Sequence, residues 1–187
     1  MPLCLLDRDG VVIVNRATNV KTPSDLELLP GVPEAIARLN GAGFDVAICT
    51  NQPEVARGVL SQEQLDVIHE ALRQMLAARG ATVEFTLCCG YDHKSPRRKP
   101  GGGMLREALA RYRAVPAETP FVGDQVDDLK AAFHAGCRRV LVRTGLGRKT
   151  LENGLPQYLA PVEVHTDLAD VVDAQLDGKH TPWPASR

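Results

Sequence analysis

The chain has 187 residues, of which 44% are hydrophobic and 24% are charged, as in a globular domain of ordinary size, so wholesale disorder is excluded. The 22 basic and 23 acidic residues leave a net charge of −1, which argues against a general nucleic-acid-binding protein. The five cysteines are odd in number and include no Cys-x-x-Cys pair, so we expect free thiols and a cytoplasmic location. We expect neither a signal peptide nor a membrane-spanning segment.

Short apolar runs alternate along the chain with segments of helical periodicity. Strands are predicted at residues 3–6, 11–14, 44–49, 83–87, 120–122, 139–142 and 162–165. Helices are predicted at residues 33–40, 62–79, 104–112, 129–133 and 168–176. The second helix opens with a capping-box pattern, Ser61-x-x-Gln64. The alternation predicts an α/β fold with three layers, in which helices cover both faces of a mainly parallel sheet. We expect a single domain over residues 1–177 and a loose C-terminal tail over residues 178–187.

Polar and charged residues directly follow several of the predicted strands. Ligands of parallel sheets bind beyond the carboxyl ends of the strands. The residues in such places are Asp7, Asp9, Thr50, Lys99 and Asp124. Taken singly, each also fits a turn, a helix cap or a surface charge. Taken together, two acids, a hydroxyl, a lysine and further acids predict an anion site with a divalent metal. The sequence contains neither a P-loop nor a Gly-x-Gly-x-x-Gly motif for a nucleotide.

These pieces resemble, in order and spacing, the four motifs of the haloacid dehalogenase (HAD) superfamily of phosphotransferases. Residues 7–10 (Asp-Arg-Asp-Gly) are similar to its first motif, Thr50 to its second, Lys99 to its third and residues 123–124 (Gly-Asp) to its fourth. Other segments resemble the branch that holds heptose bisphosphate phosphatases and histidinol-phosphate phosphatases. They are Thr-Asn-Gln at 50–52, Ala-Arg-Gly at 56–58, Arg-Lys-Pro at 98–100 and Thr-Gly-x-Gly-Arg-Lys-Thr at 144–150. The resemblance implies a Rossmann-like HAD fold, and the short connections between motifs predict no large cap domain.

The resemblance also implies a role for each matching residue. Asp7 would be the nucleophile that forms an aspartyl-phosphate, and Asp9 would act as acid and then as base. Thr50 and Lys99 would bind the phosphoryl oxygens. Mg²⁺ would be held by the Asp7 carboxylate, the Asp9 backbone carbonyl and the Asp124 carboxylate. The implied substrate-binding residues are Asn15, Arg16, Ala17, Thr18, Asn51, Gln52, Pro53, Arg98 and Gln125. Such a mechanism divides one difficult step into two, while the cations offset charge on the transferring group.

Two features depart from the pattern of the heptose phosphatases. Those enzymes usually carry a zinc loop, with Cys-x-His and later Cys-x-Cys before Arg-Lys-Pro, whereas this chain offers Cys88, Cys89 and His93. A structural zinc ion takes four ligands, so we expect no structural zinc. In addition, Gln125 stands where the heptose enzymes often have lysine, which removes one cation from the substrate site.

The resemblance thus implies a Mg²⁺-dependent phosphomonoesterase of a sugar phosphate, foremost of the 7-phosphate of D-glycero-D-manno-heptose 1,7-bisphosphate. Histidinol phosphate and a polynucleotide 3′-phosphate are the alternative substrates. A phospho-acceptor or ligand-binding module is the alternative from another class of protein. Asp9 favours the enzyme, because an acid two residues after the acceptor promotes turnover rather than storage of the phosphoryl group. We expect a monomer that binds no membrane and no nucleic acid.

Overall fold

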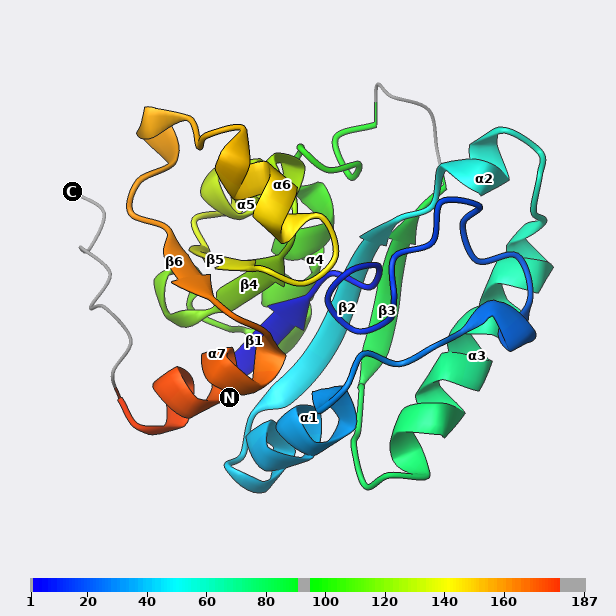
Figure 1. The fold of residues 1–187 in the computed structure, drawn as a ribbon, viewed down its shortest axis with the longest axis horizontal. Helices are drawn as coiled ribbons and strands as arrows, with labels where there is room; N and C mark the ends of the chain where they lie inside the picture. Colours follow the sequence, from blue (N-terminus) through cyan, green and yellow to red (C-terminus); the bar gives the residue numbers. More distant parts are fainter. Residues whose placement is uncertain (1, 91–94, 179–187) are drawn as a thin grey trace.

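The computed structural model describes residues 2–90 and 95–178, which form a six-stranded parallel sheet with helices around it (Figure 1). The strands are β1 (Leu3–Leu6), β2 (Asp45–Asn51), β3 (Phe85–Cys89), β4 (Pro120–Gly123), β5 (Arg138–Val142) and β6 (Glu163–His165). Their order in the sheet is β3-β2-β1-β4-β5-β6. The chain therefore winds outward from β1 first on one side and then on the other, and the switch point lies between β1 and β4.

Helices and short 3-10 turns connect the strands. The helices are α1 (Val32–Gly41), α2 (Pro53–Ala56), α3 (Gln62–Ala77), α4 (Gly103–Tyr112), α5 (Val126–Ala135), α6 (Gly147–Glu152) and α7 (Leu168–Leu176). The 3-10 turns are η1 (Pro23–Asp25), η2 (Pro116–Glu118) and η3 (Gln157–Leu159). The predicted capping box opens α3: the Gln64 N–H donates to the Ser61 hydroxyl at 3.2 Å, and the Ser61 N–H donates to the Gln64 side chain at 2.8 Å. The predicted α/β class with a parallel sheet is confirmed.

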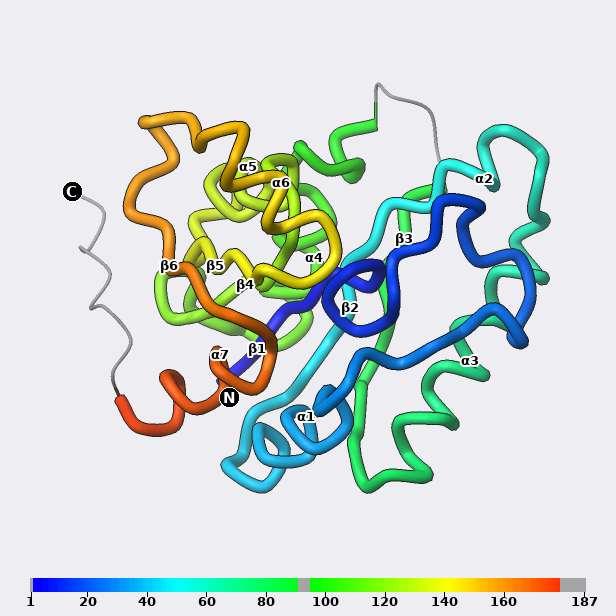
Figure 2. The backbone as a smooth tube through the Cα atoms, in the orientation of Figure 1, coloured from blue at the N-terminus to red at the C-terminus, as the bar shows by residue number. Residues whose placement is uncertain are grey.

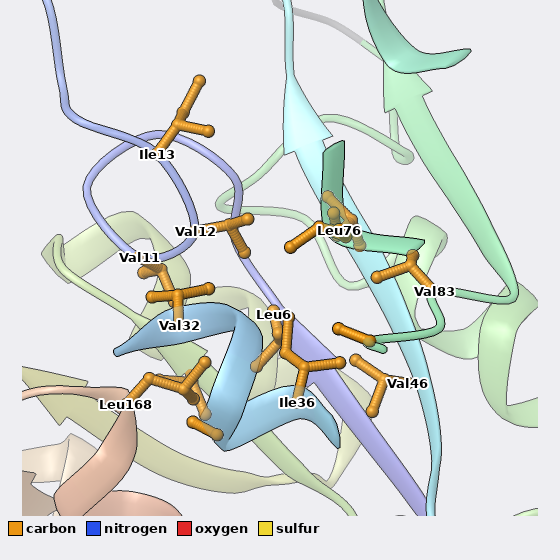
Figure 3. Close-up of a cluster of buried hydrophobic side chains, with 14 of the residues drawn as sticks. Leu6, Val11, Val12, Ile13, Val32, Ile36, Val46, Leu76, Val83 and Leu168 are labelled. Atoms are coloured by element: carbon orange, nitrogen blue, oxygen red, sulfur yellow. The ribbon is translucent and has the colours of Figure 1, made fainter. Parts of the chain in front are cut away.

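Apolar side chains cover both faces of the sheet because successive strand residues point to opposite sides. On one face, α1, α3 and α7 pack against the strands, and Figure 3 shows Leu6 of β1, Ile36 of α1 and Val46 of β2 meeting there. On the other face, α4 and α5 pack against residues such as Leu5 and Phe121. Each fully buried aliphatic side chain of this kind stabilises the fold by about 1.5–3 kcal/mol. The result is the predicted three-layer arrangement.

The strand predicted at residues 11–14 is wrong, because the chain turns back on itself directly after β1. The N–H groups of Val11, Val12 and Ile13 all point to the Arg8 carbonyl, at 3.4, 2.9 and 3.0 Å, and Figure 2 shows the tube closing a ring there. Gly10 makes this turn with φ of +84°, which side chains other than glycine's rarely allow. The apolar run is nevertheless buried against α1. Pairing at this run is limited to isolated bridges of Ile13 with Asp9 and with Leu28, so its hydrophobicity reflects burial in the core and not a strand of the sheet.

The connections that carry the functional motifs are short. Between β1 and α1 the chain contains only the turn η1, and α2 and α3 lie between β2 and β3. Within residues 2–90 and 95–178 these connections form no second sheet. None of the helices described is both long and apolar enough to cross a bilayer. Apart from residue 178, the predicted C-terminal tail lies outside the described residues, so the domain boundary at residue 177 stays a prediction.

Candidate active site

A cleft of about 270 Å³ lies at the carboxyl ends of the central strands, beside the switch point of the sheet. The parallel register brings these ends together, because Leu6 at the end of β1 pairs with Ile48 of β2 and with Val122 of β4. The cleft is lined by Asp7, Arg8, Asp9, Asn15, Asn19, Thr50, Asn51, Gln52, Pro53, Glu54, Arg98, Lys99, Gln125, Asp127 and Asp128. All four residues predicted as catalytic are thus in one place, as the strand-end argument requires.

Asp7 is a buried residue of the cleft and directly follows β1. Its Oδ1 is 2.7 Å from the Lys99 Nζ and also accepts the Arg8 N–H at 2.8 Å. Burial raises the pKa of Asp7 to about 8; the charge of Lys99 opposes this increase, whereas the carboxylates of Asp128 and Asp124 add to it. Without a further cation, the surroundings of Asp7 therefore hold more negative charge than Lys99 alone can balance.

Lys99 is fixed both by its backbone and by its ammonium group. The Asn51 side chain accepts the Lys99 N–H at 3.0 Å and donates to the Lys99 carbonyl at 2.9 Å, which ties the loop after β3 to the end of β2. The Nζ contacts Asp7 and Asp128, each at 2.7 Å. Burial disfavours the ammonium ion, but these two carboxylates outweigh it and raise the pKa of Lys99, so the side chain stays charged.

A group of three buried carboxylates offers a place for a divalent cation. Ligand oxygens of Asp7, Asp124 and Asp128 all lie within 4.8 Å of one another. Asp124 accepts the Leu146 N–H at 2.7 Å through Oδ2, while its Oδ1 is buried without a hydrogen-bond partner. Burial raises the pKa of Asp124 to about 7, and Asp128 adds to this increase. An unpartnered buried oxygen beside other carboxylates fits a hard cation such as Mg²⁺, which prefers oxygen ligands.

Asp128 is the member of this group that the sequence analysis did not assign. Its Oδ2 accepts the N–H groups of Asp124 and Gln125, at 3.1 and 3.0 Å, and so caps the start of α5. Its Oδ1 contacts Lys99. These contacts show that Asp128 orients both the lysine and the loop that bears Asp124. The signal in the sequence was an acid three residues after Gln125, because a side chain at this position of the first helical turn can accept the N–H of the residue that caps the helix.

The segment at residues 144–150 packs closely against Asp124, and glycines at positions 145 and 10 leave room for the Asp124 carboxylate. A side chain at Gly145 would begin 2.2 Å from the Asp124 carboxylate, and one at Gly10 would begin 2.1 Å from it. Leu146 contributes its N–H to this carboxylate, and the Thr150 hydroxyl donates to the Asp124 carbonyl at 2.8 Å. The segment therefore holds Asp124 closely from two sides.

Asp9 lies nearer to solvent, with 25% of its side chain exposed. Its Oδ1 accepts from Arg8 Nη2 at 3.1 Å, and its Oδ2 accepts from Arg8 Nε at 3.0 Å and from Gln52 at 3.1 Å. Gln52 also donates to the Thr50 hydroxyl at 2.9 Å. One arginine and one glutamine thus hold the predicted acid and base at the edge of the cleft. The Asp9 backbone carbonyl as a metal ligand stays a prediction.

The predicted substrate-binding residues fall into two groups. The group that lines the cleft consists of Asn15, Asn51, Gln52, Pro53, Arg98 and Gln125. The group that does not line it consists of Arg16, Ala17 and Thr18. Arg16 forms a surface ion pair with Glu27 at 3.2 Å. Asn19 and Glu54, which the sequence analysis did not assign, line the cleft, and the Asn19 amide donates to the buried Glu54 carboxylate. No motif in the sequence singled out this pair.

Cys88 and Cys89, which stand near the position of the zinc loop in the heptose phosphatases, lie at the end of β3. Cys88 is half-buried and Cys89 is buried in the core under α4. Consecutive strand residues point to opposite faces of a sheet, so these two thiols are poorly placed to bind the same ion. His93 lies outside the described residues. The absence of a structural zinc stays a prediction.

Comparisons with known proteins agree with the geometry of the site. The model of the family described as HAD-hydrolase-like matches residues 96–171. A D-glycero-β-D-manno-heptose-1,7-bisphosphate 7-phosphatase of Bordetella bronchiseptica is 42% identical to the chain, covering 94% of this chain and 98% of its own length. The enzyme of the same name from Pseudomonas putida is 40% identical, covering 84% of this chain and 91% of its own length.

Solved structures show the same relationship. The D,D-heptose 1,7-bisphosphate phosphatase of B. bronchiseptica, complexed with magnesium and phosphate, has a TM-score of 0.89 at 41% identity, covering 95% of this chain and 99% of its own. The D,D-heptose 1,7-bisphosphate phosphatase of Burkholderia thailandensis has a TM-score of 0.73 at 34% identity, covering 97% of this chain and all of its own.

Proposed function

The chain belongs to the HAD-like hydrolase family, and from this premise we propose that it removes the 7-phosphate of D-glycero-β-D-manno-heptose 1,7-bisphosphate. The observation that carries the proposal is the buried pair of Asp7 and Lys99 beside the unpartnered oxygen of Asp124. This arrangement supplies a nucleophile, a cation for the phosphoryl oxygens and a metal ligand at one point. The names of the similar proteins point to the heptose and to its β anomer.

In the first half of the proposed reaction, the Asp7 carboxylate attacks the phosphorus of the 7-phosphate. The bond between phosphorus and the bridging oxygen breaks as the acyl-phosphate bond to Asp7 forms. Protonated Asp9 gives its proton to the leaving oxygen, so that the sugar departs as an alcohol. Lys99 and the Thr50 hydroxyl bind the oxygens of the transferring group. Lys99 suits this role because it is buried and charged beside Asp7.

In the second half, water attacks the phosphorus of the aspartyl-phosphate. Asp9, now ionised, takes the proton of that water, and the bond between phosphorus and Asp7 breaks to release inorganic phosphate. Asp7 and Asp124 would hold Mg²⁺ together with the Asp9 carbonyl, and the ion would neutralise charge on the transferring phosphoryl group.

With the 7-phosphate bound beside Asp7, the sugar and the second phosphate of the substrate would lie in the outer part of the cleft. Arg98 and Gln125 line this part, and Arg98 directly precedes the phosphoryl-binding Lys99. Neighbouring residues of a loop can face different ends of one ligand. A planar guanidinium forms two parallel hydrogen bonds with a phosphate, so Arg98 suits the phosphate that is not transferred.

The proposal is tested by measuring phosphate release from the β and α anomers of the heptose bisphosphate, from histidinol phosphate and from a 3′-phosphorylated oligonucleotide. We expect the highest kcat/KM with the β anomer, dependence on added Mg²⁺, and loss of activity with a chelator. Asp7→Asn serves as the matched control for contaminating phosphatases, because it changes one atom of the nucleophile. A higher kcat/KM with any of the other three substrates would overturn the proposed specificity.

A further inference from the structure

We propose that His69 is a positioning residue that acts through Arg8 on Asp9, the proposed acid and base. The inference rests on the proposed phosphatase function, because the orientation of Asp9 matters as an acid only in such a reaction. His69 lies on α3, 61 residues along the chain from Arg8, and no sequence motif marks it as a functional residue.

The contact that supports this role joins Arg8 to the middle of α3. Nη1 of Arg8 lies 3.3 Å from Nε2 of His69. A guanidinium group can only donate hydrogen bonds, so the His69 Nε2 must accept and its ring proton must lie on Nδ1. Arg8 is 1% exposed, and a cation buried to this extent needs a partner for each part of its fork.

The partners of Arg8 lie around the whole guanidinium group. Nε and Nη2 donate to Asp9, Nη2 also donates to the side-chain Oε1 of Gln52 at 3.0 Å, and Nη1 donates to His69. The contacts to Asp9 and Gln52 involve one side of the fork. His69 contacts the other side, so it restrains rotation of the plane that presents two hydrogen bonds to Asp9.

His69 is suited to this position because it is a neutral acceptor near neutral pH. Burial lowers the pKa of His69 to about 4, and the charge of Arg8 adds to this decrease. The carboxylates of Asp66, on the same helix, and of Asp9 oppose the decrease without cancelling it. A protonated imidazole would instead place a second cation against Arg8 and could not accept its hydrogen bond.

The proposal predicts a loss that depends on the leaving group. A sugar alkoxide needs the proton of Asp9 when it departs, whereas p-nitrophenolate is stable without it. In His69→Leu, which keeps an apolar volume but removes the acceptor, we expect kcat with the heptose bisphosphate to fall about 10–100-fold, as for a misplaced catalytic group. We expect a much smaller loss of kcat with p-nitrophenyl phosphate, and KM values that stay close to those of the parent.

Conservative and control variants separate positioning from a general effect on the fold. His69→Gln keeps an acceptor at a similar reach and should retain most of the activity, whereas the shorter His69→Asn should not. Val67→Ala on the same helix, at a position that is 58% exposed, should leave both substrates unaffected. If His69→Leu does not fold, the comparison of His69→Gln with His69→Asn decides the question in its place.

The experiment also separates this inference from the proposed function. If the parent protein releases no phosphate from the heptose bisphosphate, the proposed function is wrong. If the parent is active but His69→Leu keeps its full kcat, or loses activity equally with both substrates, the positioning role of His69 is wrong. An equal loss in His69→Gln and His69→Asn would likewise contradict it.

Discussion

Two polar clusters meet at the end of β1, and they hold buried charge in opposite ways. In the carboxylate cluster, Asp7, Asp124 and Asp128 lie together, and Lys99 forms ion pairs with two of them, Asp7 and Asp128. In the arginine cluster, which consists of Arg8, Asp9, Gln52 and His69, one cation meets one carboxylate and two neutral acceptors.

The two clusters start from neighbouring residues of the turn that follows β1. Asp7 and Arg8 are adjacent, yet their side chains enter different clusters. The arginine cluster is balanced without a ligand. The carboxylate cluster keeps a surplus of negative charge that raises the pKa values of Asp7 and Asp124, and a divalent cation would remove that surplus. The surplus of negative charge thus favours cation binding in the carboxylate cluster, whereas the balanced contacts of the arginine cluster suit the proposed orientation of Asp9.

Within the carboxylate cluster, removing the proposed nucleophile, Asp7, should have the largest effect on activity. Asp7→Asn keeps the shape of the side chain but cannot form an acyl-phosphate and is a weaker metal ligand. We expect phosphate release to be lost while the circular dichroism spectrum stays that of the parent. Activity above a few per cent of the parent rate would rule out covalent catalysis through Asp7.

Removing the cation of the carboxylate cluster should cost both activity and stability. Lys99→Met leaves two carboxylates buried at 2.7 Å from a side chain that no longer carries charge. Breaking a buried pair in this way lowers the free energy of unfolding by about 3–5 kcal/mol. The control is Lys130→Met, since the 3.9 Å contact of Lys130 with Asp127 is a surface pair worth about 1 kcal/mol or less. Urea unfolding gives the free energy of unfolding of each variant; similar losses in Lys99→Met and Lys130→Met would show that the buried ion pairs of Lys99 contribute no more than a surface pair.

Arg98 lies outside both clusters and tests whether the outer cleft recognises a second phosphate. We expect Arg98→Ala to lower kcat/KM for the heptose bisphosphate by about 1.5–3 kcal/mol, the range for a lost charged hydrogen bond. The loss with p-nitrophenyl phosphate should be much smaller. Arg97→Ala is the matched control, because Arg97 pairs with Glu107 at 3.1 Å and does not line the cleft. Equal losses with both substrates would place Arg98 on the transferred phosphate instead.

The charge surplus also predicts how pH and metal affect stability. Because folding raises the pKa of Asp7 from 3.8 to about 8, the folded protein binds the extra proton between these values. The contribution of Asp7 to stability is therefore complete below pH 3.8 and is lost as the pH rises through about 8. We expect the Tm in the presence of a chelator to fall over this range, and Mg²⁺ to restore it. Asp7→Asn should reduce both effects; an unchanged dependence would mean that other groups cause it.

In the arginine cluster, the free energy of unfolding should depend on pH in the opposite direction and to a smaller extent. Folding lowers the pKa of His69 from 6.5 to about 4, so the unfolded chain binds the extra proton between these values. The stability due to neutral His69 is present above pH 6.5 and is lost as the pH falls through about 4. Unfolding measured from pH 4 to 7 should therefore be less pH-dependent in His69→Gln than in the parent. An identical slope in both proteins would show that folding leaves the pKa of His69 unchanged.

The sequence alone determined the α/β class of this chain and predicted its principal site residues. Periodicity shows which segments form strands and helices, and the rule that ligands bind at the carboxyl ends of parallel strands selects Asp7, Thr50, Lys99 and Asp124. Each of these residues follows a strand or matches a motif of fixed spacing, so local information suffices. The structure places all four at the predicted pole of the sheet, around the point where β1, β2 and β4 end.

Only the tertiary structure decided the contacts between segments that are far apart in the sequence. Hydrophobicity could not distinguish a paired strand at residues 11–14 from a buried turn, because both bury apolar side chains. The turn depends on Gly10, which has a positive φ and leaves no room for a side chain beside the Asp124 carboxylate. Likewise, nothing local to α3 indicates that His69 meets Arg8, and nothing at residue 19 indicates that Asn19 meets Glu54. Periodicity assigns a residue to one face of its own element, whereas the partner on another element depends on how the elements pack.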